Sequence, residues 1–275
     1  MVSHVAVASS GLAIPTSTED GPNSRSALTR RATSGQLTWT GPLILVTGRT
    51  GLMIVAQAFV ACLFWIQKGR WSWNAAAPWW SVYGTLVDIG CLGLMVLYSR
   101  KEGIRLRDLI GRPRLRWGRD VFVGIGCLVV VFPFFMAAAP VVTRLVYGSG
   151  QPPLYPGLLT ARALPLWATV YSLSLWWLVW SPTEEMTYLG YAFPRIEALS
   201  RGRWIAVVIV GFWWALQHAF LPLVLDWQYI AWRFLAFLPG VVVLTLLYLK
   251  VRRLPPLILA HWTLDILAML ITLKF

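Results

Sequence analysis

The chain alternates between long apolar stretches and short polar segments. Seven of these stretches approach or exceed the roughly 20 apolar residues that a helix needs to cross a lipid bilayer. An α-helix also satisfies its backbone hydrogen bonds within one segment, which a span in lipid requires. We therefore predict an all-α, polytopic membrane bundle of seven transmembrane helices, or eight if residues 182–199 form a separate element. The seven stretches cover approximately 43–66, 79–98, 120–142, 163–181, 204–225, 230–249 and 255–273.

The first 40 residues do not share this pattern. They are rich in Ser, Thr, Gly and Ala, and they contain neither an apolar core nor the hydrophobic region of a secretory signal. We expect residues 1–40 to form a disordered tail. The transmembrane helices then divide into an N-terminal group at 41–160 and a C-terminal group at 161–275.

Composition and charge favour a membrane protein over a nucleic-acid-binding protein. Hydrophobic residues make up 57% of the chain and charged residues 13%, and the charged share is roughly half of that in soluble proteins. The formal charge of +13 comes from Lys and Arg between the apolar stretches, with eight basic residues between 100 and 119. The tail and every second loop are the more basic ones, as in the cytoplasmic loops of membrane proteins. We therefore expect a multi-pass protein of the cell membrane with a cytoplasmic N-terminus, in contact with the lipid bilayer and with no nucleic acid.

A few ionisable residues interrupt the apolar stretches. Each is a functional hypothesis, because a charge inside a membrane is costly. Arg49 lies near the cytoplasmic end of the first span, where its side chain could extend to the membrane surface. Asp88 is isolated in mid-span, and we expect it to pair with Arg49 or Arg233. The full set is Arg49, Asp88, Glu184, Glu185, His218, Arg233, His261 and Asp265.

The two adjacent glutamates follow one of the most apolar runs of the chain. Before them, Ser181-Pro182-Thr183-Glu184 has the form of a capping box, with Ser181 as N-cap and Glu184 at the third helical position. This pattern predicts a helix that begins at Ser181. The dipole of such a helix would help to keep Glu184 ionised.

Both histidines outside the tail lie in apolar stretches downstream of the glutamates. His261 and Asp265 are four residues apart and share a helix face. Packing of the spans could bring these two residues, Glu184 and His218 into one polar pocket. A carboxylate with two imidazoles suits water activation, because the carboxylate can take a proton while the imidazoles orient the water and stabilise an oxyanion.

Other interpretations of these residues stay open. Two His and one Glu also form a hydrolytic zinc ligand set, so Glu184, His218 and His261 could hold Zn²⁺, although the compact His-Glu-x-x-His signature is absent. Alternatively, the histidines could serve as interhelical hydrogen-bond donors. The glutamates could cap a helix, and His261 and Asp265 could simply satisfy each other.

Three motifs in the C-terminal part occur in the order found in one known family. They resemble the motifs Glu-Glu-x-x-x-Arg, Phe-x-x-x-His and His-x-x-x-Asn/Asp of the CPBP family of intramembrane proteases. That family includes the CAAX prenyl endopeptidases and the bacterial Abi and bacteriocin-immunity proteins. The resemblance covers roughly residues 163–273 and implies that 161–275 is a catalytic transmembrane core. The motifs read Glu184-Glu185-Met186-Thr187-Tyr188-Leu189 with Phe193-Pro194-Arg195 after it, Trp214-Ala215-Leu216-Gln217-His218, and His261-Trp262-Thr263-Leu264-Asp265.

The resemblance implies a role for each motif position. Glu184 would be the general base that activates water, and His218 would hold that water with it. His261 and Asp265 would stabilise the oxyanion at the scissile carbonyl. Glu185 and Trp214, the latter at the aromatic position of the second motif, would be supporting residues. The family was named for a presumed metal and has been treated as metalloprotease-like, whereas a water-activating carboxylate needs none.

The first motif departs from the family at Leu189, where arginine is usual. Glu185 would normally pair with that arginine, so it needs another partner here, and Arg195 and Arg233 are candidates.

Three functions are therefore considered. The first is an endopeptidase acting on a membrane-associated peptide or protein. The others are a catalytically impaired relative that serves as an immunity or scaffold protein, and a proton-coupled transporter that uses the same carboxylate and imidazoles as its relay.

Overall fold

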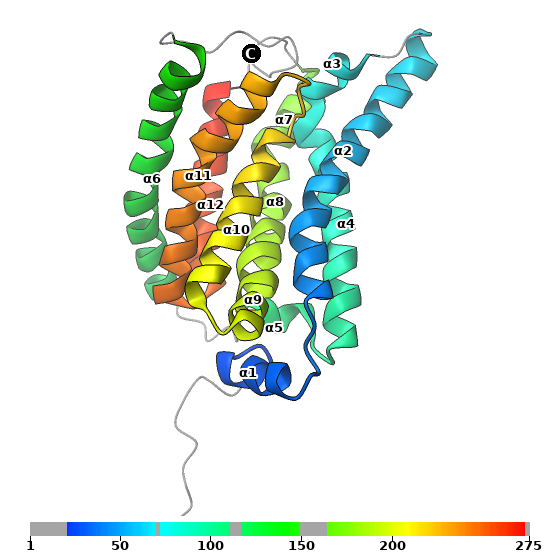
Figure 1. Ribbon diagram of the computed structural model, residues 1–275. Helices are drawn as coiled ribbons and strands as arrows, with labels where there is room; N and C mark the ends of the chain where they lie inside the picture. The colour runs from blue at the N-terminus through cyan, green and yellow to red at the C-terminus, as the bar shows by residue number, and fades with distance from the viewer. Residues whose placement is uncertain (1–20, 70–71, 111–116, 149–163, 273–275) are drawn as a thin grey trace, which may run out of the picture.

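The chain folds into a helical bundle. The computed structural model describes residues 21–69, 72–110, 117–148 and 164–272, and over these residues it contains helices and no β-strand. The long helices run side by side, and the short helix α1 lies across one end, which we call the α1 end (Figure 1). The all-α prediction is thus confirmed for this part of the chain. The helices are α1 Arg25–Thr33, α2 Thr40–Lys68, α3 Trp73–Ala76, η1 Ala77–Trp79, α4 Trp80–Lys101, α5 Leu106–Ile110, α6 Trp117–Tyr147, α7 Leu166–Ser174, α8 Trp176–Glu185, the π-helix η3 Met186–Ala192, α9 Phe193–Ser200, α10 Arg203–Ala219, α11 Trp227–Val251 and α12 Leu254–Thr272.

Several of these helices are built to cross a membrane. Among the described residues, four helical stretches are long and apolar enough to do so, and Leu254–Leu270 is a shorter apolar helix. All five lie at predicted spans, so the chain is a multi-pass membrane protein. The other two predicted spans coincide with α7–α8 and with α10, and the count of seven stays a prediction. The four long stretches are Thr40–Gln67, Trp73–Lys101, Trp117–Tyr147 and Trp227–Val251.

The helix predicted to begin at Ser181 begins earlier. Helix α8 starts at Trp176 and continues without a break through the π-helix into α9, so 182–199 extends the fourth span and forms no separate eighth element. Ser181 lies inside α8, where its buried hydroxyl donates to Asp265 Oδ2 at 2.5 Å and caps nothing. Glu184 therefore sits near the C-terminal end of α8, so the predicted stabilisation of its charge by the N-terminal end of a helix dipole is wrong.

The π-helix directly follows the two glutamates. A π-helix is rare and often marks a functional position within a longer helix. Gly190 lets this segment approach its neighbours closely, because a Cβ there would lie 2.9 Å from Leu254 Cδ1 and 3.3 Å from the carbonyl oxygen of Leu109. The close approach packs the π-helix, which directly follows the glutamates, against α5 and α12.

Part of the predicted disordered tail is folded. Helix α1 packs beside α9, with Leu28 fully buried. Asn23 ties the segment to the bundle, since its Nδ2 donates to the carbonyl of Gly190 at 3.1 Å and its Oδ1 accepts from Arg195 at 2.9 Å. The prediction of disorder is therefore wrong for this part of the tail. Residues 1–20 lie outside the described residues.

An ion cluster holds the α1 end together. Glu102, just after α4, accepts from Arg195 at 2.8 Å and from Tyr191 at 2.5 Å and pairs with Arg31 of α1 at 3.1 Å. Burial alone would raise the pKa of Glu102, but the hydrogen bonds and charge of Arg195 outweigh it and hold that pKa below its ordinary value. We call Glu102, Arg195, Arg31, Glu197 and Arg252 the α1-end cluster.

Candidate active site

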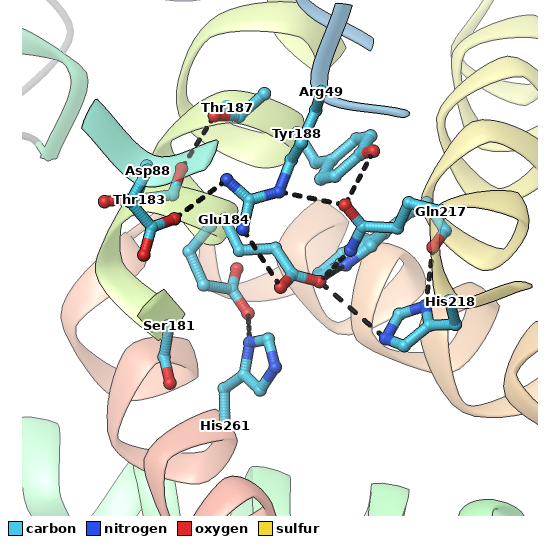
Figure 2. Close-up of polar contacts among 12 residues, drawn as sticks. Arg49, Asp88, Ser181, Thr183, Glu184, Thr187, Tyr188, Gln217, His218 and His261 are labelled. Carbon is cyan, nitrogen blue, oxygen red and sulfur yellow. Dashed lines mark hydrogen bonds and ion pairs between the residues drawn. The ribbon is translucent and has the colours of Figure 1, made fainter. Parts of the chain in front are cut away.

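Polar side chains from five helices meet in the interior of the bundle. Glu184 and His218 lie in one polar network with residues from α2 and α4 (Figure 2). The predicted His261–Asp265 pair joins this network through the contact between the rings of Trp214 and His261. Both glutamates are fully buried. We call the network the central cluster; its members are Arg49, Asp88, Ser181, Glu184, Glu185, Trp214, Gln217, His218, His261 and Asp265.

Glu184 is held from one side by hydrogen-bond donors. Its Oε1 accepts from Trp214 Nε1 and from Gln217 Nε2, the latter at 2.5 Å, and it lies 3.9 Å from His218 Nε2. Its Oε2 lies 3.6 Å from Arg49 Nη2 and has no hydrogen-bond partner within the described part of the chain. The carboxylate is thus fixed in place while one oxygen keeps free acceptor capacity.

His218 presents one ring nitrogen to Glu184. Its Nδ1 lies 2.8 Å from the carbonyl oxygen of Trp214, one helical turn earlier in α10, and its ring stacks on Phe237 with centroids 3.9 Å apart. Because a carbonyl oxygen only accepts, Nδ1 must carry the hydrogen. In the neutral ring, Nε2 then directs a lone pair toward Glu184.

Glu185 pairs with His261. Its Oε1 lies 3.2 Å from His261 Nδ1, and the other ring nitrogen lies 3.7 Å from Asp265 Oδ1. Two flanking carboxylates favour an N–H on each nitrogen of the His261 ring. The predicted partners of Glu185 are both wrong, because Arg195 binds Glu102 at the α1 end and Arg233 donates to the carbonyls of His218 and Leu221.

Arg49 and Asp88 join the cluster from the N-terminal half. The predicted Arg49–Asp88 pair is confirmed at 3.1 Å, but Arg49 is fully buried, so its predicted extension to the membrane surface is wrong. Arg49 Nε also donates to Gln217 Oε1 at 2.9 Å. Sequence reasoning missed Gln217 as well as the site role of Arg49. The available signals were the mid-span charges themselves and the amide directly before His218.

Trp214 connects the two halves of the cluster. Its indole donates to Glu184, its ring stacks on Tyr188 with centroids 5.2 Å apart, and it lies 6.1 Å from the His261 ring. The indole therefore contacts both Glu184 and the ring of His261. One rigid ring in contact with both groups helps to fix the distance between them.

The residues present do not fit the zinc site that was weighed. No group of three His, Cys, Asp or Glu side chains among the described residues is arranged to hold a metal ion. Of the three candidate ligands Glu184, His218 and His261, His261 directs its ring nitrogens toward Glu185 and Asp265. The Oε1 of Glu184 already accepts from two N–H donors. A cation and two N–H donors would compete for the same oxygen, so we derive no step through a metal.

Comparison with known proteins gives one match. Residues 164–267 match the family described as type II CAAX prenyl endopeptidase Rce1-like. Neither the comparison with curated proteins nor that with solved structures gave a match. The matched segment contains all three motifs and every predicted site residue, while Arg49 and Asp88 lie outside it. The match supports, over residues 164–267, the resemblance to the CPBP family of intramembrane proteases.

Proposed function

We propose that this protein is a membrane endopeptidase that hydrolyses a peptide bond of a membrane-associated substrate, with Glu184 as general base. The observation that carries the proposal is the Glu184–His218 pair. A neutral His218 presents its Nε2 lone pair 3.9 Å from Oε1 of an ionised Glu184, and Oε2 of the same carboxylate has free acceptor capacity. One water molecule can donate a hydrogen to each, and this holds its oxygen lone pairs free for attack.

The proposed reaction assigns each proton and bond. Glu184 takes a proton from the water while the water oxygen bonds to the scissile carbonyl carbon. The carbonyl oxygen becomes an oxyanion, which the Nε2–H of His261 stabilises, because the 3.7 Å contact of Nε2 with Asp265 is too long for a hydrogen bond. When the intermediate collapses, the carbon–nitrogen bond breaks and the proton on Glu184 passes to the leaving amine. Each step uses residues of this chain and water.

Asp265 and Glu185 support the proposed oxyanion donor. They flank His261 at 3.7 and 3.2 Å, so they keep its ring oriented and stabilise its N–H groups. Ser181 in turn donates to Asp265 at 2.5 Å and fixes that carboxylate. A donor must be held rigidly to stabilise charge that develops only in the transition state, and this chain of contacts supplies that rigidity.

The experiment compares two Glu→Gln substitutions. The purified protein in proteoliposomes is given an internally quenched, farnesylated peptide that ends in a Cys-aliphatic-aliphatic-X sequence, a probe chosen from the family description. Glu184→Gln should lower kcat by about 1000-fold, because general-base catalysis contributes roughly 10²–10⁴ in rate. Glu102→Gln, the matched control in the α1-end cluster, should leave kcat within about twofold.

The results separate the proposal from its main competitor. Leu189 favours a catalytically impaired relative that binds a partner, because the usual motif arginine is missing. That alternative predicts no cleavage by the folded wild-type protein. Cleavage that survives Glu184→Gln would remove the general-base assignment.

A further inference from the structure

Arg49 places a guanidinium beside the proposed general base. The side chain comes from α2, is fully buried and lies against the ring of Trp180 with Cζ 4.3 Å from its centroid. It pairs with Asp88 at 3.1 Å and with Glu184 at 3.6 Å (Figure 2). Removing a charge from water costs several kcal/mol per ion by order of magnitude. A fully buried arginine is therefore stable only where carboxylates such as these compensate its charge.

Arg49 also determines how Gln217 faces Glu184. A guanidinium has donors only, so the amide oxygen of Gln217 must turn toward Arg49 Nε, 2.9 Å away. The hydroxyl of Tyr188 donates to the same oxygen at 3.1 Å. With its oxygen held in this way, the amide must direct its N–H toward Glu184 Oε1, where the contact is 2.5 Å. Arg49 thus acts on both oxygens of the glutamate, on one through charge and on the other through Gln217.

The family motif places its arginine elsewhere. This chain has Leu189 at that position, fully buried in the apolar core of the bundle. Glu185, which the motif arginine would serve, pairs with His261. Over the described residues, Arg49 is the sole arginine within ion-pair distance of either glutamate.

We propose that Arg49 supplies the cation of the site from another helix, where it balances the charge of Glu184 and acts as its positioning residue, while His261 pairs with Glu185 in place of the motif arginine. The inference rests on the proposed function. It moves an essential part of the site onto α2, outside the segment that matches the family. Under this proposal, Leu189 is no sign of an inactive enzyme, because the cation enters the site from another helix.

The test compares substitutions at two fully buried arginines. Arg49→Met and Arg195→Met remove the same charge, the first at the central cluster and the second at the α1 end. With the farnesylated probe, Arg49→Met should lower kcat about 100-fold, because small errors in the placement of a catalytic group cost that much. KM should change by less than about threefold, since Arg49 is fully buried among other side chains and leaves no exposed surface for a substrate. Arg49→Lys should recover at least about tenfold of the loss, and Arg195→Met should keep kcat within about twofold.

A second measurement does not depend on activity. Unfolding temperatures are measured for Arg49→Met, Glu184→Gln and the double variant. The two effects should be non-additive, because Glu184→Gln removes the charge that Arg49→Met leaves uncompensated. Pairing Arg195→Met with Glu184→Gln should give additive effects.

Failure of the inference and failure of the proposed function give different results. If the wild-type protein leaves the probe uncleaved, the proposed function is overturned for this substrate, while non-additive unfolding temperatures still support the Arg49–Glu184 pair. Additive temperatures overturn the pair. If cleavage occurs and Arg49→Met retains kcat, or Arg195→Met loses as much, the positioning role is overturned.

Discussion

The central cluster and the α1-end cluster contain the same kinds of charged groups in different states of hydrogen bonding. At the α1 end, both oxygens of Glu102 accept hydrogen bonds from Arg195, and both oxygens of Glu197 accept from Arg252. In the central cluster, one oxygen each of Asp88, Glu184 and Glu185 has no hydrogen-bond partner within the described residues. The more deeply buried cluster is therefore the less completely satisfied one.

The difference separates a structural cluster from a proposed catalytic one. Buried polar atoms in folded proteins are nearly always hydrogen-bonded, and leaving one unpaired costs about 1–3 kcal/mol. The α1-end cluster avoids that cost and ties α1, α4, α9 and the end of α11 together. In the central cluster, three carboxylates each leave one buried oxygen without a hydrogen bond. This destabilising arrangement is expected where acceptors must stay available to water or substrate.

After the general base itself, the largest expected effect comes from removing His261. His261→Ala takes away the proposed oxyanion donor and leaves Glu185 and Asp265 facing each other without a proton donor between them. We expect kcat for the farnesylated probe to fall roughly 10²–10³-fold, the usual loss for one oxyanion-hole donor. Rates are compared at equal amounts of folded protein, measured by size-exclusion chromatography. A kcat within about twofold of wild type would remove His261 from the mechanism.

The matched change at the α1 end should affect stability instead. Glu102→Gln breaks the contacts to Arg195 and Arg31 and should lower the free energy of unfolding by roughly 2–4 kcal/mol. The unfolding temperature, followed by intrinsic tryptophan fluorescence, should fall by roughly 5–10 °C. Equal stability of the variant and the wild type would show that the α1-end cluster does not hold the fold.

The same carboxylate should make stability depend on acid. The pKa of Glu102 is held below its ordinary value in the folded protein, so its contribution is present above the ordinary pKa of about 4.3. That contribution is lost as the pH falls through the lowered folded-state pKa, because the protonated group no longer pairs with Arg195. Between about pH 5 and pH 3, the wild-type unfolding temperature should therefore fall more steeply than that of Glu102→Gln. Parallel curves would contradict the assignment.

The sequence predicted what depends on local pattern. Long apolar stretches required helices, and the structure has helices at each predicted span. The motif spacing selected Glu184, His218, His261 and Asp265, which lie in one network. Residues four apart on a helix meet whatever the tertiary structure, so the approach of His261 and Asp265 followed from spacing alone.

The predictions that failed are those decided by partners from distant segments. The capping signature at Ser181 was overridden because its hydroxyl binds Asp265, 84 residues later. Arg49 stays inside the bundle because Asp88 and Glu184, on two other helices, compensate its charge. The tail folds at α1 because Asn23 and Arg31 find partners near α9 and α4. These contacts do not follow from the sequence around each residue, although the mid-span charge of Asp88 was a signal for the pairing of Arg49.

The smallest expected effect separates two arginines of the same helix. Arg31 pairs with Glu102 at 3.1 Å with its side chain 18% exposed, whereas Arg25 pairs with Glu197 at 3.6 Å and is 70% exposed. Exposed ion pairs contribute about 0–1 kcal/mol because water and salt screen them. Arg31→Gln should therefore lower the unfolding temperature by a few degrees, roughly 2–4 °C, and Arg25→Gln by less than about 1 °C.

High salt provides a control. Measuring both variants at high salt should reduce the difference between their unfolding temperatures only slightly, since a buried pair is screened less than an exposed one. Equal losses at the two positions would mean that α1 is held by its overall positive charge, with no special part for the Glu102 contact.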